Sequence, residues 1–134
     1  MSYDLDFVIY DDTKLIKKIL SDIGFKYKGR YFIHSKCPFF VEFVSPPVAV
    51  GNDPIKAFDL LKTPLGKIKL LSPYDCLRDR LASYFHWDDL QALDQAILVY
   101  EKNKKKIDLE HLKQWSQREK NLRKFNHFLE KIED

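Results

Sequence analysis

Two aspartates near the amino terminus, Asp4 and Asp6, have a spacing that suits metal chemistry. Residues two apart on a β-strand point to the same face, with Cα atoms about 6.5 to 7 Å apart. Two carboxylates at that spacing can converge on one hard divalent cation or share a pair, as phosphoryl transfer requires. Glu42, in a later apolar stretch, is a candidate third carboxylate if its strand lies beside the first. We therefore take Asp4, Asp6 and Glu42 as candidate catalytic residues, with Asp4 and Asp6 as candidate Mg²⁺ ligands. Acidic pairs are also common on solvent-exposed strand edges, which is the plain structural alternative.

A second group of charged residues lies between positions 75 and 89. Arg78 follows Asp75 by three residues, so the two can form an ion pair along one helix face. That face is either a solvated array of ion pairs or a polar groove in which Arg78 and Arg80 bind phosphate through two hydrogen bonds each. The His86-Trp87 pair is expected to end this helix and to pack its corner.

The net charge of +3 is unevenly distributed along the chain. Residues 72–101 hold six acidic and two basic side chains, whereas residues 102–124 hold nine basic and three acidic ones. The basic segment includes the nucleic-acid-binding candidates Lys102, Lys104, Lys105 and Lys106. Lysines also favour the carboxyl end of a helix and solvate the turn that follows, so the run has a structural reading as well.

Strands and one helix are expected to position the acidic pair. Apolar patterning predicts strands over residues 3–10, 25–27, 31–34, 39–44 and 67–71, and an amphipathic helix from residue 13 that Gly24 ends. Asp11 or Asp12 can cap that helix. Residues 48–63 read as a loop with one helical turn. Aromatic and basic residues alternate over residues 26–32 and resemble a nucleic-acid surface, although aromatic residues at strand spacing are more often core: the aromatic ones are Tyr27, Tyr31 and Phe32, and the basic ones Lys26, Lys28 and Arg30.

From Ser72 onward the pattern is helical. Ser72-Pro73 is a strong helix start, Asp88 is expected to cap a second helix and Asp108 a third, and a last helix carries Phe125. The order indicates an α+β fold: a mixed β-sheet with one helix over residues 1–71, then a helical bundle over residues 72–134 packed on it.

Composition excludes several protein classes. The 134 residues suit one compact unit, and 45% hydrophobic residues exclude global disorder. No apolar run has the length of a membrane span and no signal peptide is evident, so we expect a cytoplasmic protein that does not bind membranes. Cys37 and Cys76 lack metal-ligand spacing and are expected to be reduced thiols.

The Asp-Leu-Asp-Phe motif at residues 4–7, the capped helix after it and the lone acid at Glu42 resemble the minimal nucleotidyltransferase superfamily, which includes polymerase-β-like enzymes and abortive-infection toxins. The resemblance extends over nearly the whole chain. It is most specific at residues 71–81, 86–89 and 95–96, with further signatures at residues 115–116, 125 and 128. The family has a Gly-Gly or Gly-Ser helix start before its acidic pair, which holds the nucleotide phosphates. No such element precedes Asp4 in this sequence, so we expect either a degenerate member or a truncated sequence.

The resemblance implies a nucleotide transfer from a nucleoside triphosphate to an unknown acceptor, with Mg²⁺ held by Asp4 and Asp6. Glu42 stands in for the family's third acid. Arg78 or Arg80 corresponds to a basic residue directed at the triphosphate, and Asp89 to an acid that positions substrate. The alternative is a catalytically inactive protein that binds RNA or a protein partner in a toxin–antitoxin or phage-defence system. A third reading is an oligomer subunit whose partner replaces the missing element.

Overall fold

A computed structural model describes residues 4–133 and confirms a mixed α+β fold. The chain divides into two compact units, residues 1–48 (unit 1) and 49–134 (unit 2). The sequence analysis placed the division between strands and helices after residue 71. That position is where the strands end and the first helix of unit 2 begins, at Pro73, and it is not the boundary between the two units. The strands between residues 49 and 70 belong to unit 2. Tyr3, the first residue of the first predicted strand, lies outside the described residues.

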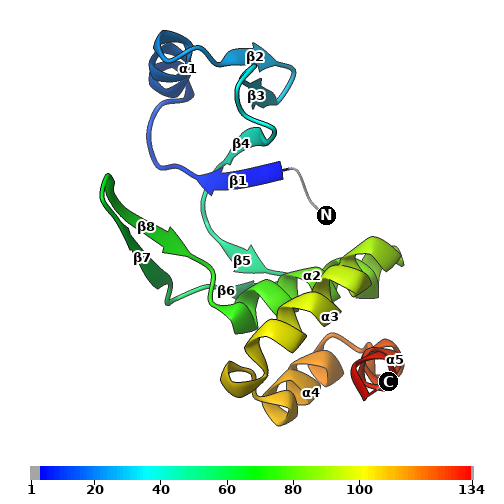
Figure 1. The fold of residues 1–134 in the computed structure, drawn as a ribbon. Helices are drawn as coiled ribbons and strands as arrows, with labels where there is room; N and C mark the ends of the chain where they lie inside the picture. Colours follow the sequence, from blue (N-terminus) through cyan, green and yellow to red (C-terminus); the bar gives the residue numbers. More distant parts are fainter. Residues whose placement is uncertain (1–3, 134) are drawn as a thin grey trace. The chain divides into compact units, whose positions relative to one another are not determined.

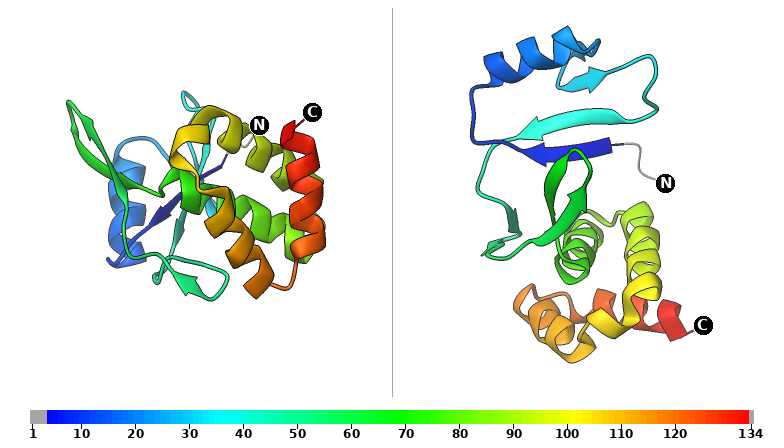
Figure 2. Two further views of the ribbon diagram at one scale, coloured as in Figure 1. Left: turned by 90° about the horizontal axis from the view of Figure 1, so that it is seen from below. Right: turned by 60° about the vertical axis from the view of Figure 1, so that its left-hand side comes forward.

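Unit 1 is a four-stranded mixed sheet with one helix (Figure 1). Its elements are β1 (Asp4–Val8), α1 (Thr13–Asp22), β2 (Lys26–Lys28), β3 (Tyr31–Ile33) and β4 (Phe40–Val44). The strand order is β1-β4-β3-β2. β1 runs parallel to β4, whereas β2 and β3 form an antiparallel hairpin and β3 pairs antiparallel with β4. Figure 2 shows β1 and β4 side by side.

One face of this sheet carries a row of aromatic rings. The ring centroids of Phe7 and Phe43 lie 5.7 Å apart, those of Phe43 and Phe32 5.5 Å, and those of Phe32 and Tyr27 5.0 Å. Phe32 and Val41 on this face are buried. The Lys17 ammonium of α1 lies 3.8 Å from the Tyr27 ring centroid, which places α1 on the aromatic face. The opposite face holds the acidic residues.

Local capping explains where α1 begins and ends. The Asp12 carboxylate accepts a hydrogen bond from the Lys14 amide, as expected of an N-cap residue. The helix ends at Asp22, and Gly24 then adopts φ +93°, a left-handed conformation that L side chains disfavour. The predicted boundaries of this helix therefore follow from one polar N-cap and one glycine.

Unit 2 combines two short hairpins with five helical segments (Figure 1). Its elements are β5 (Ala49–Val50), β6 (Asp53–Pro54), β7 (Asp59–Thr63), β8 (Gly66–Leu70), α2 (Pro73–Trp87), α3 (Leu90–Asn103), η1 (Lys104–Lys106), α4 (Leu109–Arg118) and α5 (Leu122–Glu133). The helical turn expected within residues 48–63 is wrong, because β5, β6 and β7 occupy that stretch. Strands of two residues show no periodicity that a sequence could reveal.

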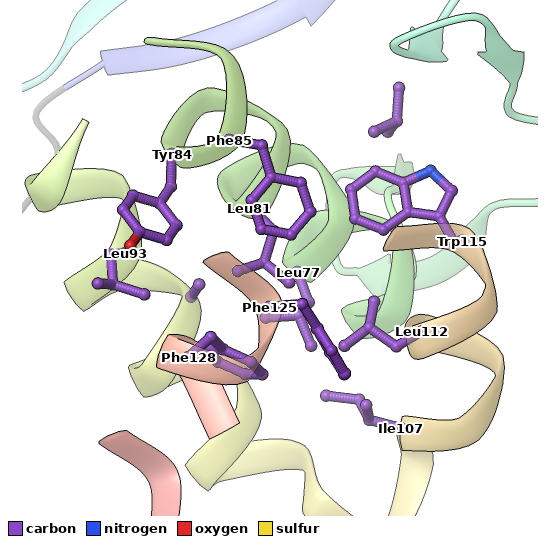
Figure 3. Packing of buried hydrophobic residues seen from close by; sticks show 12 residues of the cluster. Leu77, Leu81, Tyr84, Phe85, Leu93, Ile107, Leu112, Trp115, Phe125 and Phe128 are labelled. Carbon is purple, nitrogen blue, oxygen red and sulfur yellow. The ribbon is translucent and has the colours of Figure 1, made fainter. Parts of the chain in front are cut away.

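The core of unit 2 lies between its helices (Figure 3). Leu77 and Leu81 of α2, Leu112 and Trp115 of α4, and Phe128 of α5 are all fully buried. The Phe85 and Trp115 rings stack at 5.6 Å between centroids. Each of these side chains comes from the apolar stripe of its own helix, and this burial stabilises the bundle.

Two predictions at the α2–α3 corner need correction. Asp88 does not cap α3: it ends α2 in a left-handed conformation, φ 52°, and Asp89 caps α3 instead, accepting from the Ala92 amide at 3.0 Å. Trp87 does not pack the corner, because 82% of its surface is exposed. His86 lies in the last turn of α2 as expected, and its Nε2 contacts Glu119 at 2.8 Å.

Candidate functional site

The candidate acidic residues share one face of the unit 1 sheet. The parallel register of β1 and β4 places Asp6 directly beside Glu42, and Asp4 beside Phe40. Asp4 precedes Asp6 by two residues on the same strand, so its side chain leaves the sheet on the same face. Asp4 and Asp6 are both exposed, and Glu42 is half-buried. The geometry that the spacing predicted is therefore present in β1 and β4.

Arg30 and Tyr31 adjoin these carboxylates, although the sequence had suggested them only as part of a nucleic-acid surface. Tyr31 is the β3 partner of Glu42, and Arg30 Nε lies 3.6 Å from Glu42 Oε1. The Arg30 guanidinium donates a hydrogen bond to the Tyr31 hydroxyl. The pKa of Arg30 is raised above its usual value, first by this hydrogen bond, then by the charge of Glu42, and least by Asp4. The aromatic–basic alternation of residues 26–32 was the signal that could have identified them.

An aromatic pair borders the same group. The Tyr31 and Phe40 rings lie 5.8 Å apart between centroids, and 41% of Phe40 is exposed. Phe40 is the register partner of Asp4, so the aromatic pair and the carboxylates belong to one continuous face. This face, which we call the acidic face, is defined by Asp4, Asp6, Glu42, Arg30, Tyr31 and Phe40. It combines carboxylates, a guanidinium and aromatic rings within one unit.

The acidic face does not provide a three-carboxylate metal cage. Among residues 4–133, no three side chains of the histidine, cysteine, aspartate and glutamate types stand close enough together to hold a metal ion. Glu42 is instead engaged by Arg30. Mg²⁺ is commonly bound through only one or two carboxylates, with waters and substrate phosphates as the remaining ligands. The chemistry of Asp4 and Asp6 therefore fits a two-carboxylate site and does not fit a triad that includes Glu42.

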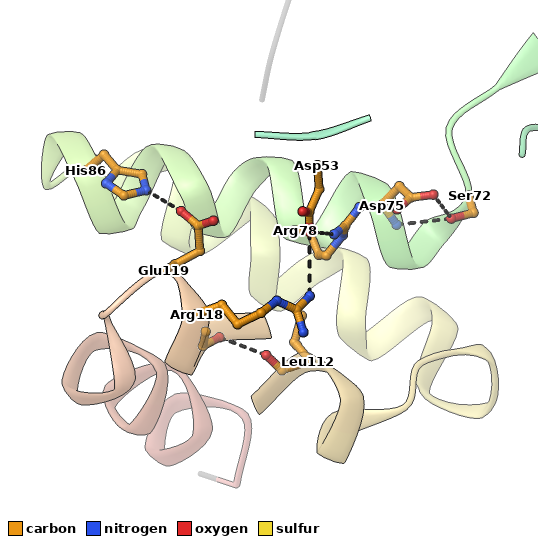
Figure 4. Close-up of polar contacts among 9 residues, drawn as sticks. Asp53, Ser72, Asp75, Arg78, His86, Leu112, Arg118 and Glu119 are labelled. Carbon is orange, nitrogen blue, oxygen red and sulfur yellow. Dashed lines mark hydrogen bonds and ion pairs between the residues drawn. The ribbon is translucent and has the colours of Figure 1, made fainter. Parts of the chain in front are cut away.

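Arg78 is held by carboxylates within unit 2 and is almost fully buried (Figure 4). Its Nη2 donates to Asp75 at 2.8 Å and its Nη1 to Asp53 at 3.0 Å. Asp53 also lies 3.5 Å from the Arg118 guanidinium. The ion pair of Arg78 with Asp75 was predicted. The alternative in which Arg78 lies on a solvated face does not fit the structure, because only 9% of its side chain is exposed. Asp53 and Arg118 were missed, since nothing local in the sequence joins β6 to α2.

Two buried nitrogens beside this network have no hydrogen-bond partner within the described residues: Arg78 Nε and Trp115 Nε1. The Arg78 guanidinium lies 5.7 Å from the Trp115 ring centroid and 5.4 Å from that of Tyr74. Burial raises the pKa of the Tyr74 hydroxyl, and the charge of Arg78 opposes this shift. Arg78 is thus enclosed by aromatic rings and carboxylates.

The remaining predicted residues also lie in unit 2, each with its own structural setting. Arg80 contacts the Asp79 carboxylate and donates to Gln95 Oε1 at 3.1 Å, while Asp89 caps α3. Lys102, Lys104, Lys105 and Lys106 are exposed at the end of α3 and in η1. Lys104 lies 5.8 Å from the Tyr100 ring centroid. Asp4, Asp6 and Glu42 are therefore brought together in unit 1, whereas Arg78, Arg80, Asp89 and the lysines belong to unit 2.

The chain matches no protein-family model, no curated protein and no solved structure. No helix within residues 4–133 has both the length and the apolar character needed to cross a membrane.

Proposed function

We propose that the chain is a nucleotidyltransferase-like protein that binds a nucleoside triphosphate on the acidic face of unit 1 and transfers a nucleotide to an acceptor with Mg²⁺. The observation that carries this proposal is the in-register pairing of Asp6 with Glu42 across the parallel strands β1 and β4. Strand pairing between distant parts of the chain places Glu42, with its partner Arg30, on the same face as Asp4 and Asp6. The exposed Phe40 ring offers a stacking surface for a base beside them.

The residues of the acidic face take distinct roles in this proposal. Asp4 and Asp6 would hold Mg²⁺, which when bound neutralises charge that develops on the leaving phosphates. Arg30 orients the triphosphate because a guanidinium recognises phosphate oxygens through paired hydrogen bonds. Glu42 and Tyr31 hold Arg30 in place through their contacts with its guanidinium. Glu42 therefore acts as a positioning residue for Arg30.

Thermal unfolding in the presence of ATP tests this proposal. We expect ATP with Mg²⁺ to raise the unfolding temperature, because ligand binding to the folded state alone stabilises it by mass action. Substitution of both carboxylates, Asp4→Asn with Asp6→Asn, should abolish the shift. The matched control is Asp11→Asn with Asp22→Asn, which removes two exposed carboxylates of the same unit that lie outside the sheet.

Two results would count against the proposal. One is an equal ATP-dependent shift in the parent and the Asp4/Asp6 double variant. The other is a shift that does not depend on Mg²⁺, since the carboxylates would then have no role as ligands. Incubation with radiolabelled ATP and total RNA or protein, followed by electrophoresis, separates binding from transfer. If transfer occurs at the acidic face, the parent should label an acceptor and the Asp4/Asp6 double variant should not.

The second candidate function is a catalytically inactive RNA- or protein-binding member of a toxin–antitoxin or phage-defence pair. The exposure of Lys102, Lys104, Lys105 and Lys106 at one turn favours it. Binding through these lysines would weaken steeply as salt increases, because each phosphate contact releases counterions. Lys104→Ala with Lys105→Ala should then weaken RNA binding, and the Asp4/Asp6 double variant should not. The opposite pattern would reject this candidate.

A further inference from the structure

The β7–β8 hairpin of unit 2 has one lysine-bearing face and one apolar face. The antiparallel register pairs Lys62 with Lys67 and Leu60 with Lys69. Because paired residues share a face and side chains alternate along a strand, all three lysines leave the hairpin on the same side. Leu61 and Ile68 pair on the other side. Figures 1 and 2 show the hairpin extending away from the helices of unit 2.

This lysine face is exposed and lacks counter-charges of its own. Lys62, Lys67 and Lys69 are all exposed, and none forms an ion pair with another residue between positions 4 and 133. Cβ atoms of directly opposed residues lie about 5 Å apart, so the charges of Lys62 and Lys67 repel each other. The only carboxylate of the two strands, Asp59, pairs with Leu70 on the apolar face.

The turn of the hairpin is built to hold this arrangement. The Thr63 hydroxyl donates to the Gly66 carbonyl at 2.9 Å and accepts from the Leu65 amide at 3.2 Å. Gly66 adopts φ +144°, which a glycine tolerates. Two-stranded ribbons are marginal on their own, and opposed like charges weaken them further. An anionic partner would remove that repulsion and stabilise the ribbon.

We propose that the β7–β8 hairpin binds the phosphate backbone of a nucleic acid through Lys62, Lys67 and Lys69. Lys67 and Lys69 are about 6.8 Å apart along their strand, which is close to the distance between neighbouring phosphates of an extended nucleic-acid strand, so the two lysines can contact separate phosphates. A lipid surface suits the hairpin less well, because insertion of the apolar face would draw the Asp59 carboxylate toward the acyl chains.

This inference does not depend on nucleotide binding at the acidic face, and its residues differ from the lysines at positions 102–106. Fluorescence anisotropy of a labelled single-stranded RNA of about 20 nucleotides, titrated at several salt concentrations, tests it. The test variant replaces Lys62, Lys67 and Lys69 by Gln. The matched control replaces three exposed lysines of unit 1 by Gln, namely Lys14, Lys18 and Lys36. Both variants lose the same total charge.

The test variant should bind RNA about tenfold or more weakly, and its slope of log affinity against log salt should fall by about 2, since each single-strand phosphate contact contributes about 0.7. The control should change both by much less. Equal behaviour of the two variants, or no RNA binding by the parent, would overturn the inference. A second comparison uses vesicles with about 30% phosphatidylserine. If vesicle binding requires these three lysines and RNA binding does not, the inference is also overturned.

A single substitution separates binding from hairpin stability. Lys67→Glu places a carboxylate opposite Lys62, so it replaces a repulsive pair by an attractive one and should not lower the unfolding temperature. RNA binding by this variant should nevertheless be weaker than that of Lys67→Gln. If the Lys67→Glu variant binds RNA as tightly as the parent, the lysine face does not contact phosphate.

Discussion

The ion pair between Arg78 and Asp75 allows a quantitative test of the unit 2 network. Arg78 Nη2 donates to the Asp75 carboxylate at 2.8 Å, and the two side chains are 9% and 17% exposed. A hydrogen bond between charged groups contributes about 1.5–3 kcal/mol when partly buried. Asp75→Ala leaves Arg78 with Asp53 as its carboxylate partner, and Arg78→Met leaves Asp75 with Ser72. We expect each single substitution to lower the free energy of unfolding by about 2 kcal/mol.

The double variant, Asp75→Ala with Arg78→Met, should lose only about 2–3 kcal/mol, because the shared hydrogen bond is lost once and no buried charge is left unpaired. The coupling energy is therefore about 1–2 kcal/mol. Urea denaturation followed by tryptophan fluorescence measures it, since both tryptophans, Trp87 and Trp115, lie in unit 2. The control cycle uses Asp79→Ala and Arg80→Met, a pair on the same helix with about a third of each side chain exposed. Its coupling should stay below about 1 kcal/mol.

A coupling energy within about 0.5 kcal/mol of zero for the Asp75–Arg78 cycle would refute this reasoning. It would mean that Arg78 is held by packing against the Trp115 and Tyr74 rings and not by its carboxylate partners. Equal coupling in both cycles would also refute it, because burial is the physical difference between the two pairs.

Three further predictions concern helix ends, a thiol and a glycine. Lys124→Met should lower the free energy of unfolding by about 1–2 kcal/mol in urea denaturation, because the ammonium donates to two carbonyls at the end of α2. Burial raises the pKa of the Cys76 thiol above its usual value of 9.0, so the unfolded chain loses this proton first as pH rises. Stability should therefore fall above pH 9.0, and less so in Cys76→Ala, when denaturation at pH 8 and pH 10 is compared. Gly24→Ala should destabilise unit 1 by about 1–2 kcal/mol, since its Cβ would lie 2.9 Å from His34 Nε2 at φ +93°. Gly29→Ala adds a Cβ in open space at φ +67°, so it should destabilise unit 1 less than Gly24→Ala does. Hydrogen exchange of the α1 amides in the two variants measures this difference.

Local signals in the sequence predicted much of the secondary structure. The N-caps Asp12, Ser72 and Asp108 are the observed ones, because side-chain oxygens that accept from nearby amides act over only three residues. The cap of α3 was misplaced by one residue, since adjacent aspartates at 88 and 89 offer the same chemistry. Apolar patterning likewise predicted strands at β1 and β4, whereas the pairing that puts Glu42 beside Asp6 was only a condition of the prediction and is supplied by the structure.

Long-range contacts account for what the sequence did not reveal. Arg78 was predicted to lie either on a solvated ion-pair face or in a polar groove, yet Asp53 of β6 and the Trp115 ring of α4 enclose it. The two-residue strands β5 and β6 exist through their pairing with each other and carry no pattern of their own. Arg30 entered the acidic face through β3–β4 pairing, which residue types alone do not specify.

The position of β4 in the middle of the unit 1 sheet has a consequence for synthesis on the ribosome. β2 and β3 are joined by a tight turn and can pair as soon as they emerge, but β1 has to wait for residues 40–44 before it acquires a hydrogen-bonding neighbour. The amino-terminal carboxylates therefore take up their final positions last within this unit. Nascent chains that stop before Phe40 should expose Leu5 and Phe7 as an unprotected extended segment, open to chaperones and proteases until β4 arrives.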